Sequence, residues 1–249
     1  MQLSMNTFKK IELVCPAGGY NQLIAAINAG ADAIYLGYKK FGARAYAENF
    51  DLSSLKKAVK ICHENNVKAY LTLNTLIKEN ELKELAYFLN EYLSFCQDGI
   101  IIQDFGIFKI IRDLFNSTRI HASTQLNIHN LESAVFLRDL NFARVVLARE
   151  MTLKNIIKIS ENADIEIEVF GHGSQCYSYS GNCYFSSFTG IRSGNRGRCT
   201  QPCRMKYSLK SKSESEILSA KSNEKNSEIK YENLLINNSF ILSKADLCT

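Results

Sequence analysis

The sequence lacks the signals of a secreted or membrane-bound protein. Residues 1–14 contain two lysines, but no apolar h-region and no small-residue cleavage site follow them, so no signal peptide is expected. No stretch approaches the ~18 uninterrupted apolar residues of a membrane span. We therefore expect a cytoplasmic protein with no membrane partner. Structural disulfides are rare in that reducing compartment, so clustered cysteines indicate metal or redox chemistry.

Several catalytic motifs are also missing. HExxH and GxSxG do not occur, and the histidines, at positions 63, 121, 129 and 172, show no metal-pair spacing. The segment ELVCPAGGYNQ, which follows the first apolar run, has no GxGxxG fingerprint, and this disfavours a dinucleotide-binding fold. A hydrolase with a nucleophilic cysteine and a distant histidine stays open, because such partners meet in space rather than in sequence.

Acidic residues are absent from residues 171–210. This segment has four arginines and two lysines and carries +6, whereas the formal charge of the whole chain is +5. Its arginines, Arg192, Arg196, Arg198 and Arg204, are interleaved with Tyr177, Tyr179, Tyr184, Phe185 and Phe188. Such a mixture can neutralise phosphates and stack on unpaired bases, so we expect contact with RNA. In the alternative interpretation the rings shield a metal centre, and the arginines bind carbonyls or a small anionic substrate.

The chain does contain a repeated unit, which consists of a short β-rich apolar run, a turn and a helix-length amphipathic stretch. Seven predicted strands lie at residues 11–17, 33–37, 68–74, 99–104, 119–125, 144–150 and 165–173. Strands that alternate with helices predict a parallel sheet. Their spacing of roughly 20 to 27 residues favours a (β/α) TIM-like barrel over a doubly wound sheet. We expect seven barrel units in residues 11–173, with the eighth missing at the C-terminal end.

The C-terminal ends of the predicted strands carry mostly polar residues, and a barrel places its chemistry at these ends. Our catalytic candidates are Asn74, Gln125, Arg149, Glu150 and His172. Arg149 can pair with the carboxylates of a small dicarboxylate. In the alternative interpretation Arg149 pairs with Glu150 or Glu168, and the other candidates are loop residues that cap helices, as we expect of Asp51 and Thr152.

Four of the eight cysteines gather in residues 174–209. Their spacing is C-x6-C-x15-C-x3-C, from Cys176 through Cys183 and Cys199 to Cys203. Structural zinc sites favour closer pairs, whereas an iron–sulfur cluster accepts ligands from separate turns. The spacing therefore favours a cluster over zinc. Cys62 and Cys96 lie on predicted helices, where we expect them to be small buried side chains.

Several of these segments together resemble one known family. The runs that carry the resemblance are ELVCPAGGYNQLIAAINAGADAIYLG, FGARAYAENF, STQLN, AREMTL, EVFGHGSQCYSYSGNCYFSS and RSGNRGRCTQPCR. They are similar to the collagenase-like peptidase family 32 of unassigned catalytic type, over residues 11–209. The resemblance implies a (β/α) barrel with a cysteine-ligated 4Fe-4S cluster near its active-site end.

Despite the peptidase label, members of that family hydroxylate RNA bases without oxygen. One type acts on a cytidine of 23S rRNA, another acts on the wobble uridine of tRNA, and prephenate is implicated as the hydroxyl source. By resemblance we expect such a hydroxylase here, with Arg44, Arg192, Arg196, Arg198 and Tyr179 as substrate-binding candidates. The alternatives are a peptidase and, since distant relatives hydroxylate ubiquinone precursors in complexes, a cluster-bearing subunit with a protein partner.

Two C-terminal segments depart from the family pattern. Residues 210–239 are rich in Ser, Lys, Glu and Asn, and we expect a flexible charged insertion. Residues 240–249 resemble the stretch before an eighth strand, so we expect a truncated barrel end. Some family members lack the cysteine that matches Cys203 but keep the one that matches Cys248. We therefore expect Cys176, Cys183, Cys199 and Cys248 as ligands, with Cys203 as the alternative to Cys248.

Overall fold

The computed structural model describes residues 11–173 and 176–207. The predicted insertion at 210–239, the predicted barrel end at 240–249 and Cys248 lie outside the described residues. Within the described ranges, no helix is long and apolar enough to cross a bilayer.

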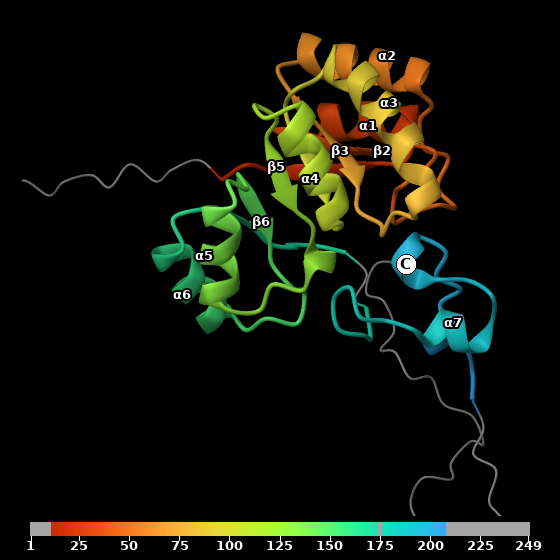
Figure 1. Ribbon diagram of the computed structural model, residues 1–249, viewed down its shortest axis with the longest axis vertical. Coiled ribbons are helices and arrows are strands. Elements are labelled where there is room, and N and C mark those ends of the chain that lie inside the picture. Colours follow the sequence, from red (N-terminus) through yellow and green to blue (C-terminus); the bar gives the residue numbers. More distant parts are fainter. Residues whose placement is uncertain (1–10, 174–175, 208–249) are drawn as a thin grey trace, which may run out of the picture.

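Seven parallel strands form one curled sheet (Figure 1). The strands are β1 (Val14–Ala17), β2 (Ala33–Gly37), β3 (Lys68–Leu73), β4 (Ile100–Ile102), β5 (Ile120–Ala122), β6 (Arg144–Val146) and β7 (Glu166–Glu168). Each strand pairs with the next in the order of the chain. A doubly wound sheet reverses its strand order at a switch point, so this unbroken order is that of a barrel. The seven predicted units are therefore confirmed as a barrel-like parallel sheet.

Helices follow the first six strands. They are α1 (Tyr20–Asn28), α2 (Leu52–Glu64), α3 (Leu82–Leu93), α4 (Phe105–Leu114), α5 (Leu131–Asp139) and α6 (Leu153–Asn162). Asp51 accepts a hydrogen bond from the Ser54 amide and Thr152 accepts one from the Asn155 amide, so the predicted helix caps are confirmed. Short 3-10 helices precede α3 and follow β5, as η1 (Glu79–Glu81) and η2 (Thr124–Leu126).

The segment after β7 does not continue the alternation. Residues 176–207, called the cysteine segment below, contain α7 (Phe185–Thr189), η3 (Gly194–Arg196) and η4 (Pro202–Arg204). Figure 1 shows this segment, in cyan and blue, as a separate lobe beside the ends of the strands. Sequence periodicity did not predict these short helices, because each is too short to show an amphipathic repeat.

Alternate residues of each strand face opposite sides of the sheet, which creates two interiors. Ile34 and Leu36 of β2 belong to the large apolar core between the sheet and the helices. Ala33 and Tyr35 of the same strand belong to a small cluster on the other, inner side. This inner side carries most of the polar groups discussed below.

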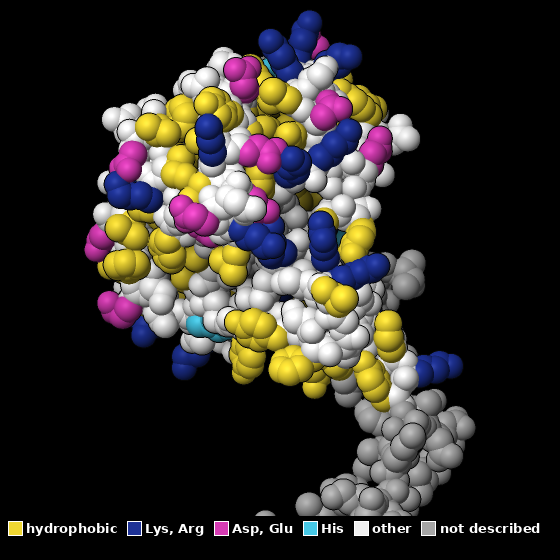
Figure 2. Space-filling model, turned by 45° about the vertical axis from the view of Figure 1, so that its right-hand side comes forward, with side chains coloured by type: hydrophobic (Ala, Val, Ile, Leu, Met, Phe, Trp, Pro, Cys, Tyr) yellow, Lys and Arg dark blue, Asp and Glu magenta, His cyan; other side chains and the backbone are white. Residues whose placement is uncertain are grey.

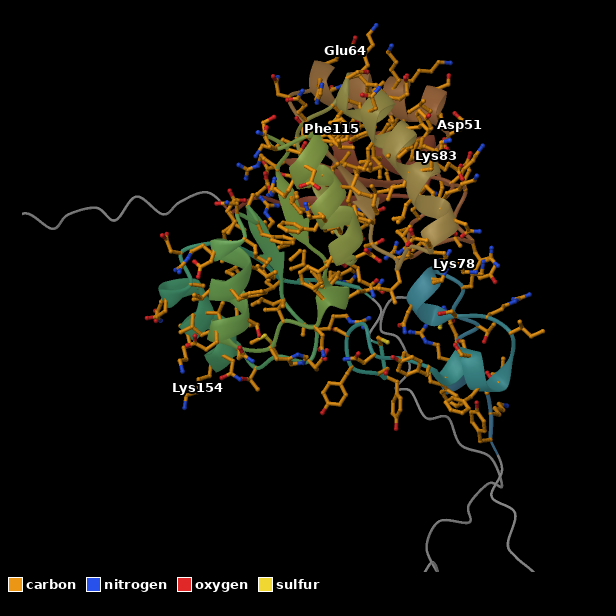
Figure 3. All side chains as sticks on the ribbon, viewed as in Figure 1. Asp51, Glu64, Lys78, Lys83, Phe115 and Lys154 are labelled. Carbon is orange, nitrogen blue, oxygen red and sulfur yellow. The ribbon has the colours of Figure 1, made fainter. Side chains whose placement is uncertain are left out.

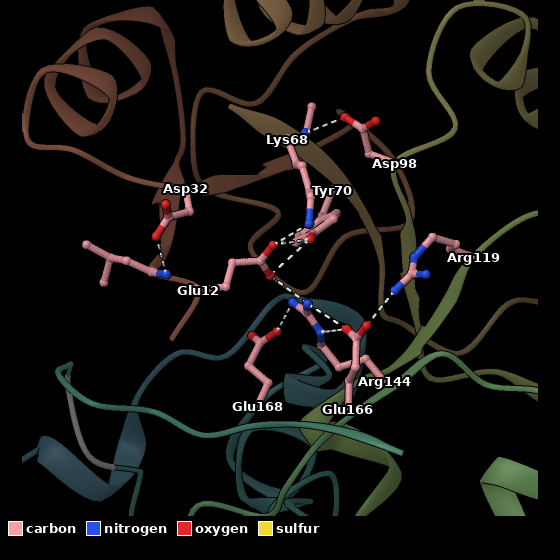
Figure 4. Close-up of polar contacts among 11 residues, drawn as sticks. Glu12, Asp32, Lys68, Tyr70, Asp98, Arg119, Arg144, Glu166 and Glu168 are labelled. Atoms are coloured by element: carbon pink, nitrogen blue, oxygen red, sulfur yellow. Dashed lines mark hydrogen bonds and ion pairs between the residues drawn. The ribbon is translucent and has the colours of Figure 1, made fainter. Parts of the chain in front are cut away.

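A charged network surrounds Arg144, at the start of β6, on this inner side (Figure 4). The Arg144 side chain is 8% exposed, and its guanidinium lies 2.6 Å from Glu12, 2.8 Å from Glu166 and 3.2 Å from Glu168. Glu12 precedes β1, whereas Glu166 and Glu168 lie on β7. The network therefore joins the two outer strands of the described sheet through β6.

Candidate functional site

A cavity of about 280 Å³ opens at the C-terminal ends of the strands. Its polar lining includes Tyr35, Arg44, Asn74, Ser123, Gln125 and Glu168. Two predicted catalytic residues, Asn74 and Gln125, therefore share one cavity with the predicted substrate-binding residue Arg44. This is the end of the sheet at which barrel proteins place their chemistry.

Arg44 reaches the cavity because the loop between β2 and α2 folds over its mouth. The Ala43 amide donates a hydrogen bond to Asn74 Oδ1 at 2.9 Å, which fixes this loop to the end of β3. The Arg44 guanidinium then lies 6.0 Å from the centre of the Tyr35 ring. Within the described residues Arg44 forms no ion pair with a carboxylate. Its charge is therefore available to an anion in the cavity.

Tyr35 and Glu168 line the cavity as weak acids. Burial raises the pKa of Tyr35, while Arg44 lowers it and Glu168 raises it further. Burial also raises the pKa of Glu168, against the opposing effect of Arg144. These effects put both Arg44 and Glu168 within electrostatic reach of Tyr35.

The cysteine segment docks beside this mouth through Arg196 and Gly197, in the region where Figure 3 labels Lys78. Arg196 Nη2 donates to Glu81 Oε1 at 2.6 Å, and Nη1 donates to Oε2 at 3.0 Å. Gly197 has a φ of 75°, and a Cβ there would lie 2.4 Å from the Gly42 carbonyl oxygen. Only glycine permits this close approach. Since Gly42 lines the cavity, the segment abuts the cavity wall.

A second contact joins the segment to the ends of β5 and β6 around Ser180, which is fully buried. The Ser180 amide and hydroxyl donate to Glu150, both at 2.9 Å, and Arg149 Nε donates to the Ser180 hydroxyl at 3.1 Å. Burial acts to raise the pKa of Glu150, but the hydrogen bonds from Ser180 outweigh it, and the pKa is lowered. This contact therefore contains a carboxylate held in its ionised form.

The group around Ser180 has the residue types of a hydrolytic triad but not the order. His129 Nε2 lies 2.9 Å from Glu150, and the Ser180 hydroxyl bonds to the same carboxylate. A triad needs the histidine between the serine and the carboxylate, because the histidine must take the proton of the serine. Ser180 therefore fastens the segment to the barrel and is not arranged as a nucleophile.

The thiols of Cys176, Cys183, Cys199 and Cys203 are free and lie near one another. Burial raises the pKa of Cys203, and the charges of the other three raise it further, so all four are electrostatic neighbours. The amide of Gln201 donates a hydrogen bond to Cys199 Sγ at 3.3 Å. Amide donors to sulfur are among the groups that tune an iron–sulfur cluster.

These thiols are not gathered as a preformed zinc site. Zn–S bonds of about 2.3 Å place the sulfurs of a tetrahedral site ~3.8 Å apart. In the described ranges, only His63, Cys96 and Asp98 bring three possible ligand atoms within 4.8 Å of one another, so no three thiols of the cysteine segment lie that close together. The choice of an iron–sulfur cluster over zinc stays a prediction from the cysteine spacing.

Of the two cysteines predicted on helices, Cys62 lies on α2, whereas Cys96 lies in the loop after α3, because that helix ends at Leu93. Cys62 and Cys96 are buried, and burial raises their pKa values to about 12 and about 11. Such thiols are protonated at neutral pH and therefore unreactive. Their interpretation as small buried side chains is confirmed.

Three predicted site residues have partners outside the cavity. Arg149 and Glu150 bind Ser180. In the alternative interpretation Arg149 pairs with Glu150 or Glu168, but within the described residues Arg149 has no carboxylate partner. Arg196 is engaged by Glu81. Substrate roles for these three residues stay predictions.

The other predicted residues are exposed. His172 lies in the bend after β7, Arg198 lies beyond η3, and Arg192 lies 5.7 Å from the Tyr46 ring. Figure 2 shows apolar side chains gathered over the lower part of the molecule, next to the grey residues. The exposed aromatic side chains of the segment include Tyr177, Tyr179, Tyr184 and Phe188, each 61% exposed or more. We call these four the aromatic surface.

Tyr35 and Glu168 as cavity residues, and Ser180 as an anchor, were not among the residues expected from the sequence. Tyr35 and Glu168 occupy inner positions of β2 and β7, so following the two-residue alternation along each strand would have found them. Ser180 gave no such signal, because its partners Arg149 and Glu150 lie about 30 residues away in sequence.

Comparison with known proteins places the chain in a family. The profile of Peptidase family U32 matches residues 18–249. The chain belongs to peptidase family U32. A U32 relative, the 23S rRNA 5-hydroxycytidine C2501 synthase of Escherichia coli, is 40% identical over 201 residues, which are 81% of this chain and 30% of that protein. The tRNA hydroxylation protein P1 of Bacillus subtilis is 35% identical over 201 residues, 81% of this chain and 48% of that protein.

A third U32 relative has a different name. A collagenase of Porphyromonas gingivalis is 35% identical over 223 residues, 84% of this chain and 52% of that protein. The chain thus spans about half the length of these curated relatives or less. The solved structure of a U32 peptidase matches with a TM-score of 0.54 and 11% identity, over 68% of this chain and 73% of that one. These matches confirm the predicted family and its α/β architecture.

Proposed function

We propose that this U32 protein hydroxylates a base of tRNA or 23S rRNA without oxygen and with the help of a 4Fe-4S cluster. Relatives named for rRNA and tRNA hydroxylation support the RNA substrate. The structural observation that carries the proposal is the placement of four neighbouring thiols on a segment that abuts the cavity wall. Both RNAs are cytoplasmic, which is where we expect the protein to act.

The cysteine segment supplies the ligands. We assign Cys176, Cys183 and Cys199 to three irons and leave the fourth to Cys248 or Cys203. When bound, such a cluster supplies one-electron chemistry. The amide of Gln201 stabilises the negative charge of the Cys199 sulfur by its hydrogen bond.

The aromatic surface is our proposed contact for RNA. Its rings offer faces on which unpaired bases can stack, and residues 171–210 contain no acidic residue that would repel phosphates. Arg192 and Arg198 remain available for phosphate contacts, whereas Arg196 is engaged by Glu81. Recognition of a single-stranded loop fits both stacking and charge.

The cavity is our proposed site for the small anionic co-substrate, a dicarboxylate such as prephenate. Arg44, whose charge has no carboxylate partner in the described part, can pair with one carboxylate. Asn74 and Gln125 offer amide groups to the rest of the compound. Arg149, the residue expected from sequence to bind the dicarboxylate, points instead to Ser180.

The peptidase alternative has less support in the described residues. The family label and the collagenase relative support it by name alone. Ser180, His129 and Glu150 do come together, but the carboxylate lies between the serine and the histidine, which is the wrong order for catalysis. The alternative of a cluster-bearing subunit predicts that hydroxylation needs a second protein.

Mass spectrometry of tRNA and rRNA nucleosides tests the proposal. Cells without the gene should lack one hydroxylated nucleoside, and the wild-type gene should restore it. A Cys183→Ser gene should fail to restore it, whereas the matched control Cys62→Ser, at a buried cysteine outside the segment, should succeed. Identical nucleosides in cells with and without the gene would exclude RNA hydroxylation.

A further inference from the structure

Glu168 has a position that no other described carboxylate shares. Of the described residues it is the one acid that lines the cavity. Its side chain is 20% exposed and lies 3.2 Å from Arg144 Nη1. The carboxylate therefore stands between a fixed positive charge below and the cavity above.

Comparison with Glu166 separates Glu168 from the rest of the network. Both residues lie on β7 and both pair with Arg144. Burial acts to raise the pKa of Glu166, but hydrogen bonds from Arg144 and Arg119 outweigh it and the pKa is lowered. Burial prevails at Glu168, whose pKa is raised. One arginine thus holds two neighbouring carboxylates whose proton affinities are shifted in opposite directions, a pattern typical of acid–base sites.

The groups that face Glu168 across the cavity complete the chemistry. Tyr35 comes from β2 and responds electrostatically to both Glu168 and Arg44. Arg44 comes from the loop after β2 and carries the one guanidinium in the described lining. An anion held by Arg44 therefore occupies the same cavity as a carboxyl group that can give or take a proton, and the Tyr35 phenol is within electrostatic reach of both residues.

We propose that Glu168 is the acid–base residue of the cavity and exchanges a proton with a hydroxyl or carbonyl oxygen of a small anionic compound that Arg44 holds. The proposal deepens, and rests on, the proposed function of the cavity. In the forward step the O–H bond of the Glu168 carboxyl breaks as an O–H bond forms on the compound. The carboxylate that remains is stabilised by Arg144, and the reverse transfer restores the carboxyl group.

Calorimetry on the protein, with prephenate as the probe, tests whether the Glu168 carboxylate takes up a proton from the buffer when an anion enters the cavity, which prepares it to give that proton to the compound. Titration in two buffers of different ionisation enthalpy gives the number of protons taken up on binding. We expect proton uptake in the wild type and in Glu166→Gln, and none in Glu168→Gln. Glu166→Gln is the matched control. It keeps a hydrogen-bonding partner for Arg144 on the same strand and leaves the cavity unchanged. Equal proton uptake in the two variants, or no binding by the wild type, would overturn the proposal.

RNA hydroxylation in cells gives the second readout. Loss of an acid–base group should lower the rate by about 100-fold or more, so Glu168→Gln should leave the hydroxylated nucleoside nearly absent. Glu168→Asp should restore part of it and Glu166→Gln nearly all. If both Gln variants lose modification and thermal stability together, Glu168 is only structural and the proposal fails. If wild-type cells contain no hydroxylated nucleoside, the proposed function fails, and the calorimetric comparison still decides the role of Glu168.

Discussion

Replacement of Arg144 by methionine should strongly destabilise the protein. Methionine keeps much of the side-chain length but removes a guanidinium that lies 2.6 to 3.2 Å from three carboxylates. Breaking a buried ion pair from one side costs about 3 to 5 kcal/mol, and here it leaves Glu12 and Glu168, whose side chains are 21% and 20% exposed, without their buried partner. That is a large share of a typical unfolding free energy of about 5 to 15 kcal/mol. With a urea slope of about 2 to 3 kcal/mol per M, the unfolding midpoint should fall by about 1 to 2.5 M.

Urea unfolding at pH 7, followed by circular dichroism, measures this loss. The matched control is Arg119→Met, because Arg119 pairs with Glu166 at the surface, with side chains 49% and 45% exposed. Exposed pairs contribute about 0.2 to 1 kcal/mol, so the control should unfold close to the wild type. If Arg144→Met and Arg119→Met have the same midpoint, the network does not hold the outer strands and our reasoning is wrong.

The pH dependence gives an independent check on the cause. The pKa values of Glu12 and Glu166 are lowered in the folded protein. Their ionised carboxylates therefore stabilise the fold above the ordinary pKa of 4.5. This stabilisation is lost as the pH falls through the pKa of the folded protein. Burial gives Glu168 a raised pKa, but Arg144 acts to lower the pKa of all three glutamates. The gap between wild type and Arg144→Met should therefore be largest at neutral pH and shrink below pH 4.5. An unchanged gap at pH 4 would assign the loss to packing.

Three further predictions concern the site. After anaerobic reconstitution, Cys248→Ser should lose iron and the visible absorption band while Cys203→Ser keeps both, and the reverse result would assign the fourth ligand to Cys203. Arg196→Ala should speed tryptic cleavage within residues 176–207 at least about tenfold, because the bidentate pair with Glu81 no longer holds the segment. Equal cleavage rates in the variant and the wild type would contradict this. Arg44→Ala should weaken prephenate binding by about 10 to 100-fold, the value of a charged hydrogen bond, and unchanged calorimetric affinity would remove Arg44 from the site.

Much of the architecture followed from the sequence because it depends on local periodicity. The alternation of apolar runs with amphipathic stretches predicted the seven strands and the helices between them in the order observed. Caps at Asp51 and Thr152 were predictable because they need only the residue itself and an amide two or three positions on. The cysteine spacing predicts a metal segment for a similar reason, since its four described thiols lie within 28 consecutive residues, 176–203, and this stays a prediction.

The arrangement of the site was decided by contacts between residues far apart in the chain. Arg149 looked free for a substrate, but Ser180, about 30 residues later, folds back onto it. Arg196 looked like a phosphate ligand until a turn 115 residues earlier brought Glu81 to it. A residue type shows which bonds a side chain can make, but only the three-dimensional packing supplies its partners. For the same reason, neither β6 nor β7 alone could show that Glu168 pairs with Arg144 and lines the cavity. Both facts follow from the curl of the sheet.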